Sequence, residues 1–191
     1  MGNTTTIGVS LPVPEPHGPL LQDVRAAFGD PAAQAIPTHI TLLPPTELPR
    51  SELPDLGRHL ARVAAGGRPF PVRLEGTDTF RPLTPVVYVR VAEGGDACAR
   101  LQEQVRSGPV QRELQFPYHP HVTVAHGTPD EAMDRVQREL AGFAAGWTAS
   151  GFALYEQGAD GVWQHLRTFP FAAALRPLPQ QPACRPAPSR L

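Results

Sequence analysis

Lysine is absent from this chain of 191 residues, whose 17 basic side chains are all arginine. Together with abundant alanine, glycine and proline, this indicates a GC-rich genome more than a phosphate-binding design. Cysteine is scarce, and the spacing of Cys98 and Cys184 excludes both a disulfide framework and a metal-ligand motif. A formal net charge of −1 argues against the basic surface that long nucleic acids require.

Long apolar runs are missing as well. Nothing approaches the roughly 18 consecutive apolar residues that cross a membrane. The first residues, 1–4, lack the charged and apolar regions of a signal peptide. We therefore expect a cytoplasmic protein that does not bind membranes, and the 41% of hydrophobic and 18% of charged residues are typical of a globular domain.

The composition changes near the C-terminus. Residues 176–191 include five prolines, no aromatic residue and no hydrophobic periodicity. Such a segment cannot bury enough apolar surface to offset the entropy lost on ordering, so the sequence predicts a flexible tail there. Residues 1–175 are predicted to form one two-lobed domain.

A four-residue pattern is present twice, as HITL at residues 39–42 and as HVTV at residues 121–124, 82 positions further on. In an extended strand, residues i and i+2 point to the same face. Each copy therefore presents an imidazole and a hydroxyl side by side and turns its apolar residues the other way. A lone His-x-Thr is most often a structural pair, but two copies in matching apolar contexts indicate a site.

The surroundings of the two motifs also match. Helix-like segments precede the motifs at 20–28 and 96–107, and others follow them at 51–65 and 129–141. Strand-like patterns cover 5–11, 37–43, 70–80, 85–91, 121–125, 147–155 and 162–171. A repeat of this size predicts two lobes related by a pseudo-twofold axis, with both His/Thr pairs in the cleft between them.

Short connections and prolines refine this prediction. Only residues 81–84 join the strands at 70–80 and 85–91, so the two strands should pair antiparallel, which favours an α+β fold over a parallel doubly wound sheet. Pro44 and Pro45 are expected to end the strand that carries the first motif, because proline cannot donate to a ladder of backbone hydrogen bonds.

These features together resemble the 2H phosphoesterase superfamily, and within it the bacterial 2′-5′ RNA ligase or RNA 2′,3′-cyclic phosphodiesterase proteins. The resemblance covers about residues 4–175. It rests on the two motifs and their separation, on FPYHP at 116–120, and on a closing strand pair with LYEQ at 154–157, GVW at 161–163 and Phe169. It implies two lobes, each an antiparallel sheet with helices on its outer face, and an active-site cleft between them.

The motif residues suit phosphodiester chemistry. Hydrolysis of a 2′,3′-cyclic phosphate requires a base for water, an acid for the leaving ribose oxygen and donors for the phosphoryl oxygens. Histidine is the side chain that supplies both acid and base near neutral pH, and a threonine at i+2 is a neutral donor in a fixed position. The resemblance implies that His39 and His121 act as the acid/base pair and that Thr41 and Thr123 bind the phosphate, with no metal or other cofactor.

Other residues are weaker candidates. The aromatic side chains of Tyr118, Phe116 and Trp163 are of the kind that stacks on a base, although core or cleft wall is the more common role. Arg81, before a predicted strand, is a possible phosphate partner or a solvated surface residue. His126 stands where many members of the superfamily have arginine, which leaves its role open.

A zinc site is the metal alternative for the histidines. His119, His121 and His126, with His39 as a fourth ligand, would form it. Pro120 interrupts the cluster, however, and the sequence places neither a carboxylate nor a cysteine beside it, so the set is a poor match to known zinc sites.

Three function classes follow. The first is a metal-independent cyclic phosphodiesterase acting on RNA ends or small cyclic nucleotides, expected to be monomeric. The second is a 2′-5′ RNA ligase that runs the reverse chemistry, for which the near-zero net charge is counter-evidence. The third is a nucleotide- or RNA-binding module of the same fold without catalysis, which would have little use for two titrating imidazoles.

Overall fold

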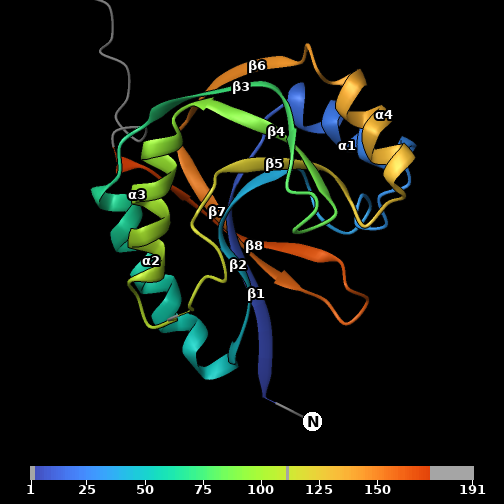
Figure 1. The fold of residues 1–191 in the computed structure, drawn as a ribbon. Coiled ribbons are helices and arrows are strands. Elements are labelled where there is room, and N and C mark those ends of the chain that lie inside the picture. Colours follow the sequence, from blue (N-terminus) through green and yellow to red (C-terminus); the bar gives the residue numbers. More distant parts are fainter. Residues whose placement is uncertain (1–2, 111, 173–191) are drawn as a thin grey trace, which may run out of the picture.

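The computed structural model describes residues 3–110 and 112–172, drawn in colour in Figure 1. The predicted tail at 176–191 lies outside the described residues. The elements in chain order are β1 (Thr4–Pro12), α1 (His17–Ala27), β2 (His39–Pro49), a 3-10 turn (Arg50–Glu52), α2 (Leu53–Gly66), β3 (Phe70–Thr79), β4 (Val86–Glu93), α3 (Gly95–Arg106), β5 (His121–His126), α4 (Asp130–Glu139), β6 (Ala144–Ala149), β7 (Gly151–Gln157) and β8 (Trp163–Pro170).

The strands form one curled sheet in the order β6-β3-β4-β5-β2-β1-β7-β8 (Figure 1). Every neighbouring pair is antiparallel. The two motif strands, β2 and β5, are neighbours at the centre, and three further strands extend the sheet on either side of them. The predicted α+β fold with two antiparallel lobes is confirmed, and each lobe is a four-stranded half of the same sheet.

The two halves are not consecutive in sequence. β3 and β4, which follow the first motif, join the half that contains β5, whereas β7 and β8, which follow the second motif, join the half that contains β2. Helices lie before and after each motif strand as predicted. Each half of the sheet therefore contains strands from both the N-terminal and the C-terminal part of the chain. This exchange of strands holds the two motifs together.

Helices cover the sheet on the side away from the motif histidines. α1 and α4 pack against the half that contains β5, and α2 and α3 pack against the half that contains β2 (Figure 1). In α3, the buried residues Cys98, Leu101, Gln102 and Val105 follow the i, i+3, i+4, i+7 spacing of one helix face. No helix in the described part of the chain is both long and apolar enough to cross a membrane.

The prediction of one continuous strand at 147–155 is wrong. The segment is divided at Ser150 into the end of β6, which pairs with β3, and the start of β7, which pairs with β1 on the other side of the sheet. The chain crosses between the halves here. A side chain at Gly151 would place its Cβ 2.5 Å from the carbonyl oxygen of Phe169, so this crossing needs a glycine.

The prediction that Pro44 and Pro45 end their strand is also wrong, because β2 continues to Pro49. Between the pairs Ile7↔Thr46 and Val9↔Leu43, the two prolines face a single residue of β1, Gly8. Two residues opposite one define a β-bulge, which tolerates proline because the extra residue does not take part in the ladder.

Candidate active site

A single residue pair, Ile40↔Val122, joins the two motif strands. Both side chains are fully buried. Their sequence neighbours must therefore point to the opposite face of the sheet, which brings both His/Thr pairs together as predicted. Extending the antiparallel register by one residue places His39 across from Thr123, and Thr41 across from His121.

Both histidines are held in the same way. Nδ1 of His39 lies 2.6 Å from the carbonyl oxygen of Pro37, and Nδ1 of His121 lies 2.7 Å from the carbonyl oxygen of His119. A carbonyl oxygen only accepts, so each Nδ1 carries the proton that it donates. The lone pair of the neutral ring is then on Nε2, which is the tautomer that a base working through Nε2 requires.

Burial shifts both histidines in the same direction. Desolvation lowers the pKa of His39 to about 4, and the charges of Arg25 and His121 lower it further against the opposing hydrogen bond to Pro37. Desolvation also lowers the pKa of His121, against the opposing hydrogen bond to the carbonyl oxygen of His119. Both rings are therefore neutral at pH 7 in the free protein, and a bound anion would favour their protonated forms.

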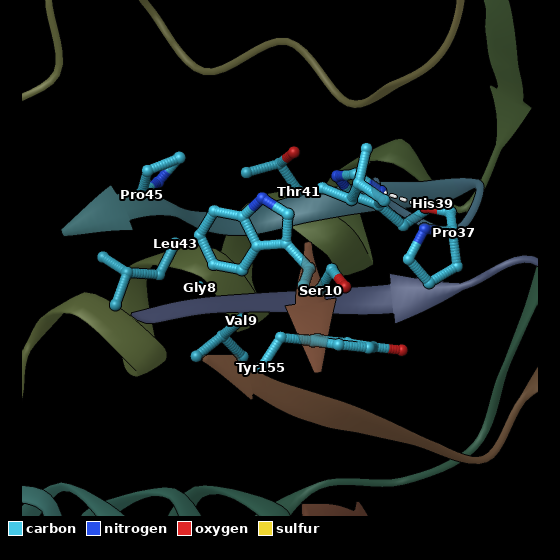
Figure 2. A pocket seen from close by; sticks show the side chains of 11 residues that line it. Gly8, Val9, Ser10, Pro37, His39, Thr41, Leu43, Pro45 and Tyr155 are labelled. Carbon is cyan, nitrogen blue, oxygen red and sulfur yellow. Dashed lines mark hydrogen bonds between the residues drawn. The ribbon is translucent and has the colours of Figure 1, made fainter. Parts of the chain in front are cut away.

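A small cavity of about 40 Å³ lies on the His39 side. Figure 2 shows His39 and Thr41 on β2 beside Ser10 of β1, with Tyr155 of β7 below them. Trp163 also lines this cavity, as the prediction of a substrate contact requires. A Cβ at Gly8 would lie 3.1 Å from the indole ring of Trp163, so the absence of a side chain at Gly8 makes room for this ring.

A larger cavity of about 510 Å³ lies on the His121 side. Phe116, which is 55% exposed, and Tyr118 line it, and their contact with a substrate stays a prediction. The Tyr118 hydroxyl donates to the carbonyl oxygen of Thr41 at 2.9 Å and so ties the segment before β5 to β2. Thr41 lines both cavities, which makes it the meeting point of the two.

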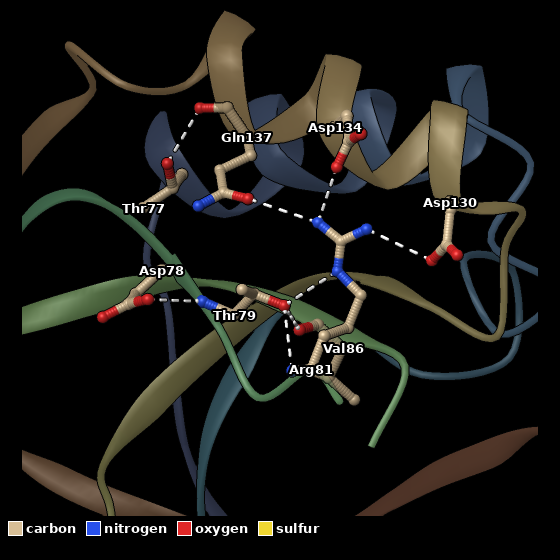
Figure 3. A network of polar contacts seen from close by, with 8 residues as sticks. All are labelled: Thr77, Asp78, Thr79, Arg81, Val86, Asp130, Asp134 and Gln137. Carbon is tan, nitrogen blue, oxygen red and sulfur yellow. Dashed lines mark hydrogen bonds and ion pairs between the residues drawn. The ribbon is translucent and has the colours of Figure 1, made fainter. Parts of the chain in front are cut away.

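Two predicted contacts line neither cavity. The Arg81 guanidinium lies 2.7 Å from Asp134 and 3.2 Å from Asp130, both on α4 (Figure 3), and its Nε donates to the Thr79 hydroxyl. Arg81 therefore fastens the β3–β4 connection to α4. His126 is exposed at the end of β5, opposite Val86. Neither position supports contact with a substrate in these cavities.

Several site residues are not among the predictions. Phe80 packs edge-on against the His121 ring, with 4.9 Å between the ring centroids, and Tyr88 lies at 5.3 Å. Ser10 is paired with Thr41 across β1 and β2, and Tyr155 reaches the site from β7. None of them belongs to a local motif, and only long-range strand pairing brings them to the histidines.

The structure does not group the four histidines of the predicted zinc alternative as ligands of a metal ion. Within residues 3–110 and 112–172, no three side chains of histidine, cysteine, aspartate or glutamate are grouped so that they could hold a metal ion. His119 instead packs against Phe80 and Tyr88, at centroid distances of 5.5 and 5.3 Å.

Comparison with known proteins shows the family to which the chain belongs. The 2′-5′ RNA ligase superfamily profile matches residues 12–161, and the chain belongs to this superfamily. A relative from Halalkalibacterium halodurans, named as a candidate phosphoesterase, is 32% identical over 132 residues, which are 69% of this chain and 76% of the relative. One from Geobacillus kaustophilus with the same kind of name is 31% identical over 136 residues, 70% of this chain and 78% of the relative.

Solved structures share this fold. The protein TT0787 of Thermus thermophilus is 25% identical and superposes with a TM-score of 0.62 over 87% of this chain and 97% of that protein. Escherichia coli LigT, crystallised with NADP+, is 17% identical with a TM-score of 0.63 over 88% of this chain and 98% of LigT. At that identity the likeness to LigT establishes the fold alone.

Proposed function

We propose that this protein is a phosphoesterase that hydrolyses 2′,3′-cyclic phosphodiesters at RNA ends or on small nucleotides, without a metal ion. The observation that carries the proposal is the crossed arrangement of two His/Thr pairs around the Ile40↔Val122 bridge. Each histidine has its Nδ1 proton engaged by a carbonyl oxygen. One constellation thus offers two proton-transfer groups and two hydroxyl donors.

The reaction follows from these groups. One imidazole accepts a proton from water at Nε2 while the water oxygen forms a bond to phosphorus. The bond from phosphorus to one ribose oxygen breaks, and the second imidazole, protonated, donates its Nε2 proton to that oxygen. The hydroxyls of Thr41 and Thr123 donate to the nonbridging oxygens, whose negative charge increases in the transition state. The product is a ribose phosphomonoester.

The relatives support a nucleotide substrate. Two are named as candidate phosphoesterases, and LigT structures are described as complexes with ATP, NADP+ and 3′-AMP. In this chain, the cavity beside His121 has the volume of a small-molecule site and aromatic walls suited to a nucleoside. The RNA terminus as substrate, the monomeric state and the cytoplasmic location stay predictions.

The size of the cavities favours hydrolysis over ligation. A 2′-5′ ligase must hold a nucleoside on each side of the phosphate. Here one side offers about 510 Å³ and the other about 40 Å³. A cyclic phosphate with one nucleoside fits this asymmetry, with the nucleoside on the larger side.

Activity should survive removal of metal ions. We expect turnover of 2′,3′-cyclic mononucleotides to be unchanged in excess EDTA, because protein side chains supply both protons and both donors, whereas a zinc hydrolase would lose its activated water. The assay should include oligonucleotides with cyclic phosphate ends, ADP-ribose 1″,2″-cyclic phosphate and 2′-5′-linked oligomers, all in chelator. Complete loss of activity, restored by a divalent ion, would overturn the mechanism, and binding without turnover of any substrate would favour the non-catalytic module.

The maximum of kcat/KM is expected on the acidic side of pH 6.5. The mechanism needs one neutral and one protonated histidine, and in the free protein the pKa of His39 is lowered to about 4 and that of His121 is also lowered from 6.5. The mixed protonation state is populated between these two pKa values and is lost as pH rises through the higher one. A kcat/KM profile from about pH 4 to about pH 9 tests this, and a rate that climbs steadily to the alkaline end would contradict it.

A further inference from the structure

The cavity beside His121 is lined by apolar and aromatic residues and by several polar ones, among them Arg112 and Glu113, and one polar residue of its lining is deeply buried. Gln102, on the buried face of α3, lines this cavity and is only 2% exposed. Its Nε2 has no hydrogen-bond partner among residues 3–110 and 112–172. A buried amide donor without a partner destabilises the folded protein, so its presence in a cavity wall calls for an explanation.

A glutamine on the corresponding helix of the other half shows the contrast. Gln22 lies on α1, which precedes β2 as α3 precedes β5. Its Nε2 donates to the carbonyl oxygen of Ile36 at 3.1 Å, and its Oε1 accepts from the Thr38 hydroxyl at 2.7 Å. Gln22 thus holds the segment that leads to His39 by hydrogen bonds. Nε2 of Gln102 makes no comparable hydrogen bond within the described residues.

The walls around Gln102 suit a flat heterocycle. Phe80, Tyr118 and His119 present rings to the same cavity, and His121 and Thr41 mark the place proposed above for the phosphate. Rings of this kind stack on any nucleobase and therefore do not discriminate between a base and another flat group. A hydrogen bond to the edge of the base provides that discrimination.

We propose that Gln102 is a specificity-determining residue, whose Nε2 donates to a carbonyl oxygen or ring nitrogen of a nucleobase bound in the cavity beside His121. The inference rests on the proposed function for the position of the phosphate. All four RNA bases carry such acceptors, so Gln102 selects substrates that have a base over cyclic phosphates that lack one.

The test compares full-length wild type with Gln102→Leu on two kinds of substrate. These are the four 2′,3′-cyclic mononucleotides and the 2′,3′-cyclic phosphate of methyl riboside, which has no base. We expect Gln102→Leu to lower kcat/KM for the nucleotides by about 10- to 100-fold and to leave the base-free substrate unchanged. Gln104→Leu is the matched control, because Gln104 is exposed on the same helix, and it should change neither value.

Thermal unfolding separates specificity from folding. The melting temperature of ligand-free Gln102→Leu should be equal to or above that of wild type, because the substitution removes an unpaired buried donor. Gln102→Met, which has a similar length but no hydrogen-bond donor, should show the same loss of preference for nucleotides over the base-free substrate. An equal loss on nucleotides and on the base-free substrate, or no loss on nucleotides, would overturn the role of Gln102.

Failure of the proposed function would be recognised separately. If wild type hydrolyses none of these cyclic phosphates, the hydrolase proposal is wrong, and calorimetric titration with 3′-AMP then tests Gln102 alone. Binding about 10- to 100-fold weaker to Gln102→Leu than to wild type supports the inference. Equal affinities, or absence of binding to wild type, overturn it.

Discussion

Replacing either His39 or His121 with alanine is expected to lower kcat for a 2′,3′-cyclic mononucleotide by about 10²- to 10⁴-fold, the usual contribution of a general acid or base. Both rings are only half-buried, and the described hydrogen bond of each reaches a carbonyl two residues away. Their removal should therefore leave the melting temperature nearly unchanged. Steady-state kinetics and thermal unfolding of the same preparations measure the two effects together.

The double variant provides the stricter test. Because both histidines act in one proton-transfer sequence, His39→Ala/His121→Ala should be scarcely slower than the slower single variant. His165→Ala is a suitable control, since this histidine is exposed on β8 and lines neither described cavity. Near wild-type turnover in either single variant, or a loss of activity that only follows a loss of stability, would show that the paired motifs are structural.

Thr41→Val and Thr123→Val should each reduce kcat by roughly 10- to 10³-fold, as expected when one donor to a developing negative charge is removed. Valine keeps the β-branched shape that suits a strand and deletes only the hydroxyl. The loss should appear in kcat and kcat/KM alike, because the donor acts on charge that increases in the transition state.

A threonine outside the site serves as the control. Thr148→Val, at an exposed position of β6, should leave both kinetic constants unchanged. If the Thr41 and Thr123 variants raise KM but keep the wild-type kcat, the hydroxyls contribute only to ground-state binding, and their proposed role in catalysis is incorrect.

Local sequence patterns predict the parts of this protein that depend on neighbouring residues. Period-two alternation predicts that His39 and Thr41 share one strand face, and the buried Ile40 between them agrees with this. Helical periodicity predicts the helices before and after each motif. The same reasoning fails at Ser150 and Pro44, where strand identity depends on which distant strand pairs with the chain.

The sequence by itself therefore determined the two His/Thr faces, the α+β class and the helices before and after each motif, because each of these follows from backbone periodicity over a few residues. Only the tertiary structure decided that β2 and β5 are neighbours and that the bridge at Ile40 and Val122 crosses the pairs. The tertiary structure also decided that Arg81 pairs with Asp134 of α4. It placed Gln102 in a cavity wall, where its Nε2 has no hydrogen-bond partner among the described residues. These outcomes depend on hydrogen bonds and burial between residues far apart in the chain, which no local pattern encodes.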